Sequence, residues 1–224
     1  NDAQLPSFPS AGVQTVQAVQ DEVIVSLDLA KNRSVSVEDL TPYLAASNEV
    51  DPTDPMIVSL AQQVMQEFGD SKDQGELALA MTDFVSAYVT QKDLSQGFAT
   101  ASEVARSKQG DCTEHAVLLA AMLRVAKIPS SVAFGLVYIE DPHSAKRDGF
   151  FGFHAWTQAL ITRSDGTKIW QDFDAAVPSE GGFDAAHILL TTTPLADDAE
   201  SVPAMLSIVQ AIGTIDIEVV EAAP

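Results

Sequence analysis

The stretch "GDCTEHAVLLAAMLRVAKIPSSVAFGLVY", residues 110–138, contains the single cysteine of this 224-residue chain. Asp111 precedes Cys112, and Glu114 follows Asp111 by three residues, which is the spacing of a capping box. The run behind it, 116–126, is apolar nearly all round, so we expect a buried central helix that ends before the proline of this stretch. Cys112 then lies in the first helical turn.

A cysteine at that position lies near unpaired backbone N–H groups and the positive end of the helix dipole. Both features favour the thiolate, which is the nucleophilic form of the side chain. A free cysteine is also commonly a small buried hydrophobic residue. Only a base within reach of the sulfur would therefore distinguish a nucleophile from a core residue.

Helical patterns precede this stretch and strand patterns follow it. Residues 53–69 carry an aspartate cap, a proline at the first helical position and a terminal glycine, which predicts a helix. Apolar residues at helical spacing continue over 77–88. Thr100 with Glu103 predicts a third, short capped helix. The periodicity changes from residue 131 onward. Strands are expected at 131–139, 153–161 and 168–174, with a long loop over 141–152 and a tight turn over 163–167. This order predicts an α+β fold.

The two ends of the chain have weaker patterns. The first twenty residues are polar and predict a loosely held arm. Residues 22–29 alternate as a half-buried strand, and 214–220 form a second such pattern with Ile215, Ile217 and Val219 inward, so the two could share a sheet. We expect an N-terminal arm and strand (1–50), a core (51–195), and a C-terminal helix and strand packed on it (196–224).

Histidines are the candidate bases, and the chain has His115, His143, His154 and His187. His115 lies on the same rigid helix as Cys112, which is a poor geometry for proton transfer. His143 lies in a polar loop, and no role is assigned to His187. His154 opens a strand next to aromatic residues, which makes it the preferred base.

The turn after this strand selects an aspartate. If residues 164–166 form a three-residue loop with a left-handed glycine, Asp174 becomes the diagonal neighbour of His154 on one face, roughly 7–8 Å away at the backbone. Asp172 then lies opposite Gln158, too far from the imidazole. A two-residue turn would move both aspartates to the other face.

Cys112, His154 and Asp174 thus form the nucleophile, base and orienting carboxylate of acyl transfer. Backbone N–H groups at the helix start could form part of an oxyanion hole, with Gln109 or Gln91 as the side-chain donor. This chemistry requires no cofactor and no bound metal.

The sequence resembles the transglutaminase-like superfamily of papain-type fold over about residues 55–190. The resemblance rests on the opening stretch, on "FHAWTQALI" (153–161) and on "KIWQDFDAA" (168–176). It implies a cysteine-bearing helix packed on an antiparallel sheet, with Cys112 as nucleophile, His154 as base and Asp174 as third member. Members of the superfamily include crosslinkers that join Gln to Lys, thiol peptidases, amidases and inactive proteins.

Within the superfamily, the chain looks most like a bacterial, often exported branch, which favours a periplasmic or secreted location. No tryptophan precedes Cys112 to match the oxyanion tryptophan of animal crosslinkers, since Trp156 and Trp170 are the only two. Hydrolysis of a peptide or amide is therefore favoured over crosslinking.

The charge of the chain restricts its partners. Twelve Lys and Arg against 32 Asp and Glu give a net charge of −20, which repels nucleic acid and anionic lipid. The mean hydropathy of +0.08, without a long uncharged apolar stretch, predicts no membrane insertion. A neutral or cationic peptide or protein substrate fits this composition.

Two alternatives remain open. A zinc site is one, and its ligands would be Cys112, His115, His154 and Asp174. A non-catalytic peptide- or protein-binding module is the other, and its recognition loop would contain Phe150, Phe151 and Phe153. Three further residues are expected to have supporting roles: Arg124 in a helix-face ion pair, Glu114 in capping and Asp172 in loop contacts.

Overall fold

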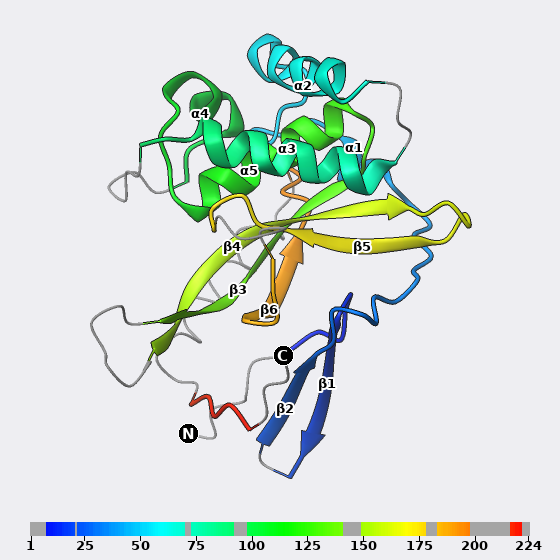
Figure 1. Cartoon of the computed structure of the whole chain (residues 1–224), viewed down its shortest axis with the longest axis vertical. Helices are drawn as coiled ribbons and strands as arrows, with labels where there is room; N and C mark the ends of the chain where they lie inside the picture. The colour runs from blue at the N-terminus through cyan, green and yellow to red at the C-terminus, as the bar shows by residue number, and fades with distance from the viewer. Residues whose placement is uncertain are drawn as a thin grey trace.

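The computed structural model describes residues 8–20, 22–69, 73–91, 98–140, 149–177, 183–197 and 216–220. Helices cover one side of an antiparallel sheet, and a separate hairpin lies on the other side (Figure 1). The helices are α1 (Thr41–Leu44), α2 (Pro55–Phe68), α3 (Gln74–Tyr88), α4 (Ala101–Ser107) and α5 (Cys112–Val125). The strands are β1 (Gln14–Val19), β2 (Glu22–Leu27), β3 (Ser130–Glu140), β4 (Gly149–Thr162), β5 (Lys168–Phe173) and β6 (His187–Thr193). The predicted α+β class is confirmed.

The central helix is α5, as predicted. The Asp111 side chain accepts from Thr113 N at 3.0 Å, and Glu114 Oε2 accepts from Asp111 N at 3.0 Å, which completes the capping box. Every residue from Thr113 to Arg124 is buried, because α5 packs on β3 and β4 while α2, α3 and α4 surround it. The apolar run therefore forms the centre of the main core.

The surrounding helices begin where their caps predict. Asp54 accepts from Met56 N at the start of α2, and Gly69 ends that helix. Thr100 and Glu103 form the capping box of α4. Local capping chemistry thus sets the boundaries of the helix layer.

The main sheet has the strand order β5-β4-β3-β6, and all its pairs are antiparallel. β4 starts at Gly149, so the predicted loop over 141–152 is wrong for residues 149–152. These residues pair with Val137–Glu140. The glycines weaken the strand pattern, but they allow close approach: a Cβ on Gly149 would lie 2.5 Å from Tyr138 Cζ. Strand β6 was not predicted.

The β4–β5 turn has the predicted geometry. Arg163 N donates to Thr167 O at 2.8 Å, and Gly166 has φ +82°. Gln158 consequently pairs with Asp172. The ladder ends at Phe173, which leaves Asp174 just beyond the sheet.

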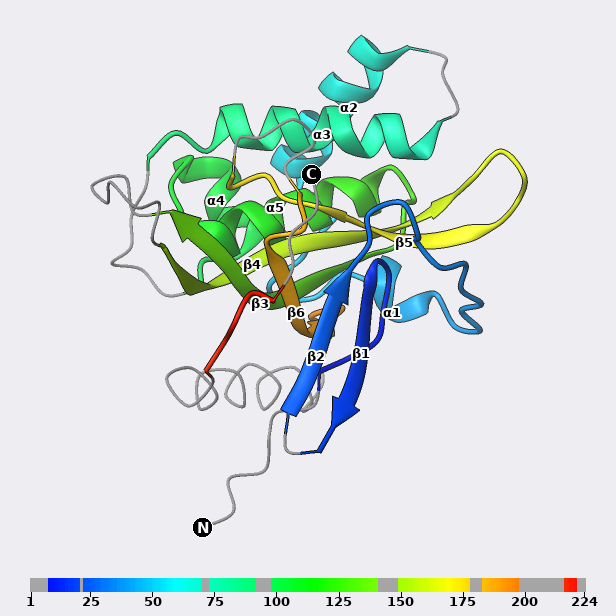
Figure 2. The same ribbon diagram turned by 60° about the horizontal axis from the view of Figure 1, so that its bottom comes forward.

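The N-terminal region differs from the expected loose arm. β1 and β2 form a two-stranded hairpin, so the partner of the 22–29 strand is residues 14–19. Figure 2 shows this hairpin beyond the sheet. The Gln14 amide anchors it, because its Oε1 accepts from Leu189 N and its Nε2 donates to Leu189 O. The polar side chain of Gln14 thus fixes the hairpin to β6, although the polar sequence around it predicts a loosely held arm.

The C-terminal strand prediction is wrong for the described residues 216–220, which belong to no helix or strand. Ile217 and Val219 are exposed, not inward. Ile215 and the helix predicted within 196–224 fall outside the described residues, apart from 196–197. Among the helices of the described segments, none has the length and apolarity needed to cross a membrane.

Candidate active site

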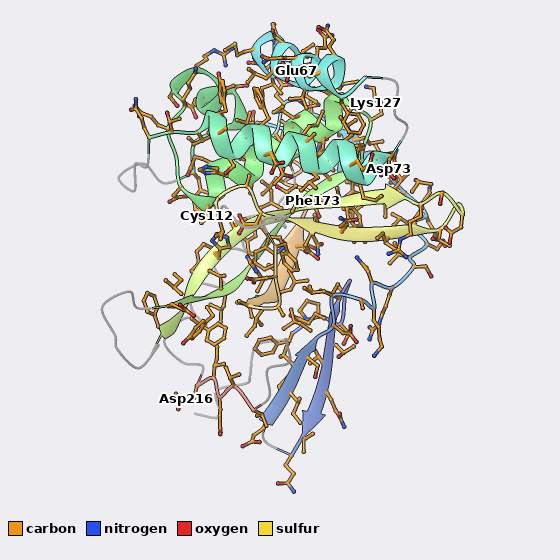
Figure 3. All side chains as sticks on the ribbon, in the orientation of Figure 1. Glu67, Asp73, Cys112, Lys127, Phe173 and Asp216 are labelled. Carbon is orange, nitrogen blue, oxygen red and sulfur yellow. The ribbon has the colours of Figure 1, made fainter. Side chains whose placement is uncertain are left out.

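Cys112 is the first residue of α5 and is half-buried. Figure 3 places it at the end of α5, where the helix layer meets the sheet. The loop before it is held by Glu114, whose Oε1 accepts from Ala99 N at 2.8 Å while Oε2 accepts from Asp111 N. A Cβ on Gly110 would lie 2.1 Å from Glu114 Cβ, so this position requires glycine. The sulfur is therefore presented by a fixed helix start.

His154 on β4 is the partner of Cys112. Its Nε2 lies 2.6 Å from Asp174 Oδ2. Its imidazole also lies close enough to Cys112 for that side chain to contribute to the raised pKa of His154. Because Nε2 is engaged with the carboxylate, Nδ1 is the nitrogen left for the sulfur. Burial would lower the pKa of His154, but the hydrogen bonds and charges of Asp174 and Cys112 outweigh it and raise that pKa to about 9. The site favours an imidazolium at neutral pH.

Asp174 follows β5 and is almost fully buried, with 2% of the residue exposed. Its Oδ1 accepts from Ala176 N at 2.8 Å and Val177 N at 3.3 Å. Burial would raise the pKa of Asp174, but hydrogen bonds from His154 and His187 and the charge of His154 lower it to about 2. The structure thus brings the three predicted residues together: His154 and Asp174 are hydrogen-bonded, and Cys112 lies beside the imidazole.

His187 also belongs to this group, and sequence reasoning gave it no role. Its Nε2 lies 3.1 Å from the same Asp174 Oδ2, and its Nδ1 lies 3.0 Å from Asp184 Oδ1. A signal was available, because "HILLTTT" (187–193) is an apolar and β-branched run with a histidine at its start. His154 was selected by the same feature.

Asp172 lies near the site without joining it, as the predicted register requires. Its Oδ1 accepts from Trp156 Nε1 at 2.8 Å and from Gln158 Nε2 at 2.7 Å. Burial raises the pKa of Asp172 to about 6, against those two hydrogen bonds and the charge of His187, which lower it. Its contacts are with neighbouring strand side chains, so the expected loop contacts are not its structural role.

The other predicted residues are placed as follows. His115 Nδ1 lies 2.5 Å from the Asp111 carbonyl, which makes His115 a hydrogen-bonded helix residue, and His143 lies outside the described residues. Gln109 Nε2 donates to Gln91 Oε1 at 2.7 Å on the segment that enters α5. The expected ion pair of Arg124 is wrong among the described residues: the buried guanidinium donates to Ser130 Oγ and to the carbonyl oxygens of Ala45, Ser130 and Pro194, because this end of α5 faces main-chain carbonyls and not acidic side chains.

One group in the described part of the chain has a metal-ligating arrangement. The ligand atoms of His154, Asp174 and His187 all lie within 4.8 Å of one another. The zinc site considered from the sequence is a different set of residues: it contains Cys112 and His115 and lacks His187. His115 is instead hydrogen-bonded to the Asp111 carbonyl.

Fold and site together define a class: α+β proteins in which a helix-borne cysteine meets a strand-borne histidine and an aspartate. The family model of the Transglutaminase-like superfamily matches residues 59–175, just over half of the chain. The chain belongs to this superfamily, and the predicted family is confirmed. No curated protein sequence matches the chain.

Several solved structures are similar to this chain. A candidate cysteine protease from Cytophaga hutchinsonii is 23% identical with a TM-score of 0.53, covering 74% of this chain and 50% of that one. The periplasmic domain of TgpA from Pseudomonas aeruginosa is 18% identical (TM-score 0.40; 59% and 46% covered). Red sea bream transglutaminase is 14% identical (TM-score 0.42; 77% and 31% covered). The first shares the fold, and this chain spans half or less of each protein's length.

Proposed function

We propose that this chain catalyses cysteine-dependent acyl transfer on peptide or amide substrates. The observation that carries the proposal is the placement of Cys112 beside His154, whose Nε2 lies 2.6 Å from Asp174 Oδ2. Cys112 acts as nucleophile, His154 as general base and acid, and Asp174 orients His154. Membership of the superfamily favours this chemistry.

The reaction has two steps, acylation of Cys112 and transfer of the acyl group to an acceptor. The Cys112 sulfur attacks the carbonyl carbon, and the amide C–N bond breaks as the His154 imidazolium gives its proton to the leaving nitrogen. His154 then takes a proton from the acceptor, whose oxygen or nitrogen attacks the thioester, and the sulfur leaves as thiolate. The backbone N–H of Cys112 stabilises each oxyanion, since first-turn N–H groups have no helical acceptor.

Water is the acceptor we favour, so the activity is that of a thiol peptidase or amidase. Neither tryptophan lies before Cys112 in the chain. Trp156 is buried against Asp172, and Trp170 packs on Tyr43, which leaves both in structural contacts. The net charge of −20 favours neutral or cationic substrates over acidic ones.

Trapping the acyl-enzyme tests this proposal. Intact-protein mass spectrometry after mixing with a peptide library should find an adduct that is absent in Cys112→Ala. Release of the adduct by water alone supports hydrolysis, whereas release only after glycine ethyl ester is added supports crosslinking. Absence of any adduct from a folded protein, together with alkylation of Cys112 that does not respond to His154→Ala, would contradict acyl transfer.

A non-catalytic peptide-binding module is the second candidate, because the end of the β3–β4 pair exposes apolar side chains. Phe150 is 59% exposed and Ile139 42% exposed. Exposed aromatic residues suit recognition as well as substrate binding. For such a module, iodoacetamide should label Cys112 no faster than an ordinary exposed thiol, and the rate should lack a bell-shaped pH dependence.

A further inference from the structure

His187 is a buried polar residue that the proposed reaction does not use. Only 2% of its side chain is exposed, yet both ring nitrogens have partners, Asp174 and Asp184. Its ring stacks on Phe183 at 4.6 Å and meets Trp156 edge-on at 5.4 Å between centroids. These contacts hold the imidazole in one orientation, with Nε2 directed at the carboxylate of the site.

The direction of the hydrogen bond follows from the chemistry of the partners. The ionised Asp174 carboxylate can only accept, so the Nε2 of His187 carries the hydrogen. The same Oδ2 accepts from His154 Nε2, while Oδ1 accepts from the backbone N–H groups of Ala176 and Val177. The carboxylate therefore cannot rotate without breaking hydrogen bonds at both oxygens.

We infer that His187 is a positioning residue, which donates from Nε2 to Asp174 Oδ2 and thereby keeps that carboxylate directed at His154. The inference rests on the proposed function of Cys112 and His154. Its consequence concerns the tautomer of His154: with Nε2–H held by Asp174, the neutral ring presents Nδ1 as an acceptor for the proton of Cys112. A rotated carboxylate would permit the opposite tautomer, whose Nδ1 cannot accept.

The charged groups around His187 come from three parts of the chain. Asp174, after β5, and Asp184, before β6, bracket the ring. His154 on β4 lies 5.6 Å away between centroids, and the charge of His187 acts on Asp172 of β5. Loss of the Asp174 bond leaves that carboxylate without one of its two side-chain donors.

Paired substitutions test the inference. His187→Phe keeps the ring stacking and removes the donor, whereas His187→Gln places an amide N–H near the Nε2 position. We expect iodoacetamide labelling of Cys112 at pH 6–8 to slow about tenfold in His187→Phe and to stay within about twofold of wild type in His187→Gln.

Nitrogen-15 NMR of the imidazoles supplies a readout that strand damage would not change. At pH 10.5, above the His154 pKa of about 9, the neutral ring should remain the Nε2–H tautomer in wild type and His187→Gln, and become mixed in His187→Phe. Gln14→Leu is the matched control, because it loosens β6 at Leu189 without touching Asp174. It should leave rate and tautomer unchanged.

The outcomes separate the two proposals. Wild-type rate and tautomer in His187→Phe, or equal losses in both His187 variants and in Gln14→Leu, would overturn the role of His187 alone, provided that Asp174→Asn slows labelling. If labelling in folded His154→Gln and Asp174→Asn equals that of wild type, the proposed function itself fails.

Discussion

Asp174 is the buried carboxylate that both histidines of the site contact. It accepts from two imidazoles and two backbone N–H groups, which lowers its pKa to about 2 although burial alone would raise it. Its stabilising contribution is present above about pH 4 and is lost as the pH falls through about 2. Asp174 and His154 therefore titrate outside the range in which the proposed reaction needs both charges.

The first prediction concerns His154, whose pKa rises from 6.5 to about 9 on folding. The folded state binds this proton more tightly, so the stabilisation is full below about pH 6.5 and is lost as the pH rises through 9. We expect the free energy of unfolding in urea to fall by up to about 3 kcal/mol between pH 6.5 and 9.5. His154→Gln should remove most of this slope, and an unchanged slope would contradict the assignment.

Asp172 shows the same direction of pH dependence as His154, at lower pH. Its pKa is about 6 in the folded protein against 3.8 for the free group, so stability is lost as the pH rises through this interval. Asp172→Asn keeps a side-chain oxygen as acceptor for Trp156 and Gln158 and removes the buried charge. We expect about 1–3 kcal/mol of stabilisation at pH 7.5 and little at pH 4.

Denaturation of the Asp172→Asn variant at both pH values is the measurement. An equal effect at pH 7.5 and pH 4 would show that charge is not the cause. The variant should label at Cys112 like wild type, because Asp172 does not contact His154. Slow labelling in Asp172→Asn combined with normal labelling in Asp174→Asn would show that Asp172, and not Asp174, orients His154.

Among the elements, the start of α5 determines where the sulfur lies. Gly110 has no room for a side chain, since its Cβ would meet Glu114 Cβ at 2.1 Å. Gly110→Ala should therefore break the capping box, lower the free energy of unfolding by about 2–4 kcal/mol and slow the labelling of Cys112. Urea denaturation and labelling at pH 7 measure both effects.

The matched control is Gly166→Ala in the β4–β5 turn. Gly166 has φ +82° but nothing within 4 Å of its Cβ position, so only backbone strain of about 1 kcal/mol is expected. Labelling of Cys112 should not change in this variant. If Gly110→Ala behaves no worse than Gly166→Ala, then the contact with Glu114 does not hold the helix start.

Across the whole molecule, the features predictable from the sequence are those set by neighbouring residues. The caps at Asp54, Thr100 and Asp111 and the glycine of the β4–β5 turn act within a few residues, and the turn placed Asp174 near His154. The proximity of His154 and Asp174 could be predicted from these local rules because both residues belong to one β-hairpin.

The features that were missed depend on contacts distant in sequence. β6 pairs with β3, which lies about fifty residues earlier, and His187 meets Asp174 through that pairing. The hairpin of β1 and β2 is held by Gln14, whose amide bonds Leu189 across 175 positions. A polar residue such as Gln14 carries no local signal of such a role, so the arm prediction was wrong for residues 14–19.

Arg124 joins distant parts of the molecule and supports the last prediction. Its guanidinium, 1% exposed at the end of α5, donates to the carbonyl oxygens of Ala45, Ser130 and Pro194, and burial lowers its pKa to about 10. Arg124→Met removes these hydrogen bonds together with that from Nε to Ser130 Oγ, and it leaves buried acceptors without donors, so we expect a loss of about 3 kcal/mol or more. Arg124→Lys should recover only part, since an ammonium cannot reproduce the planar fork. Urea denaturation measures the stability of wild type, Arg124→Met and Arg124→Lys. If Arg124→Lys is as stable as wild type, this position requires a positive charge and not the hydrogen bonds of the guanidinium.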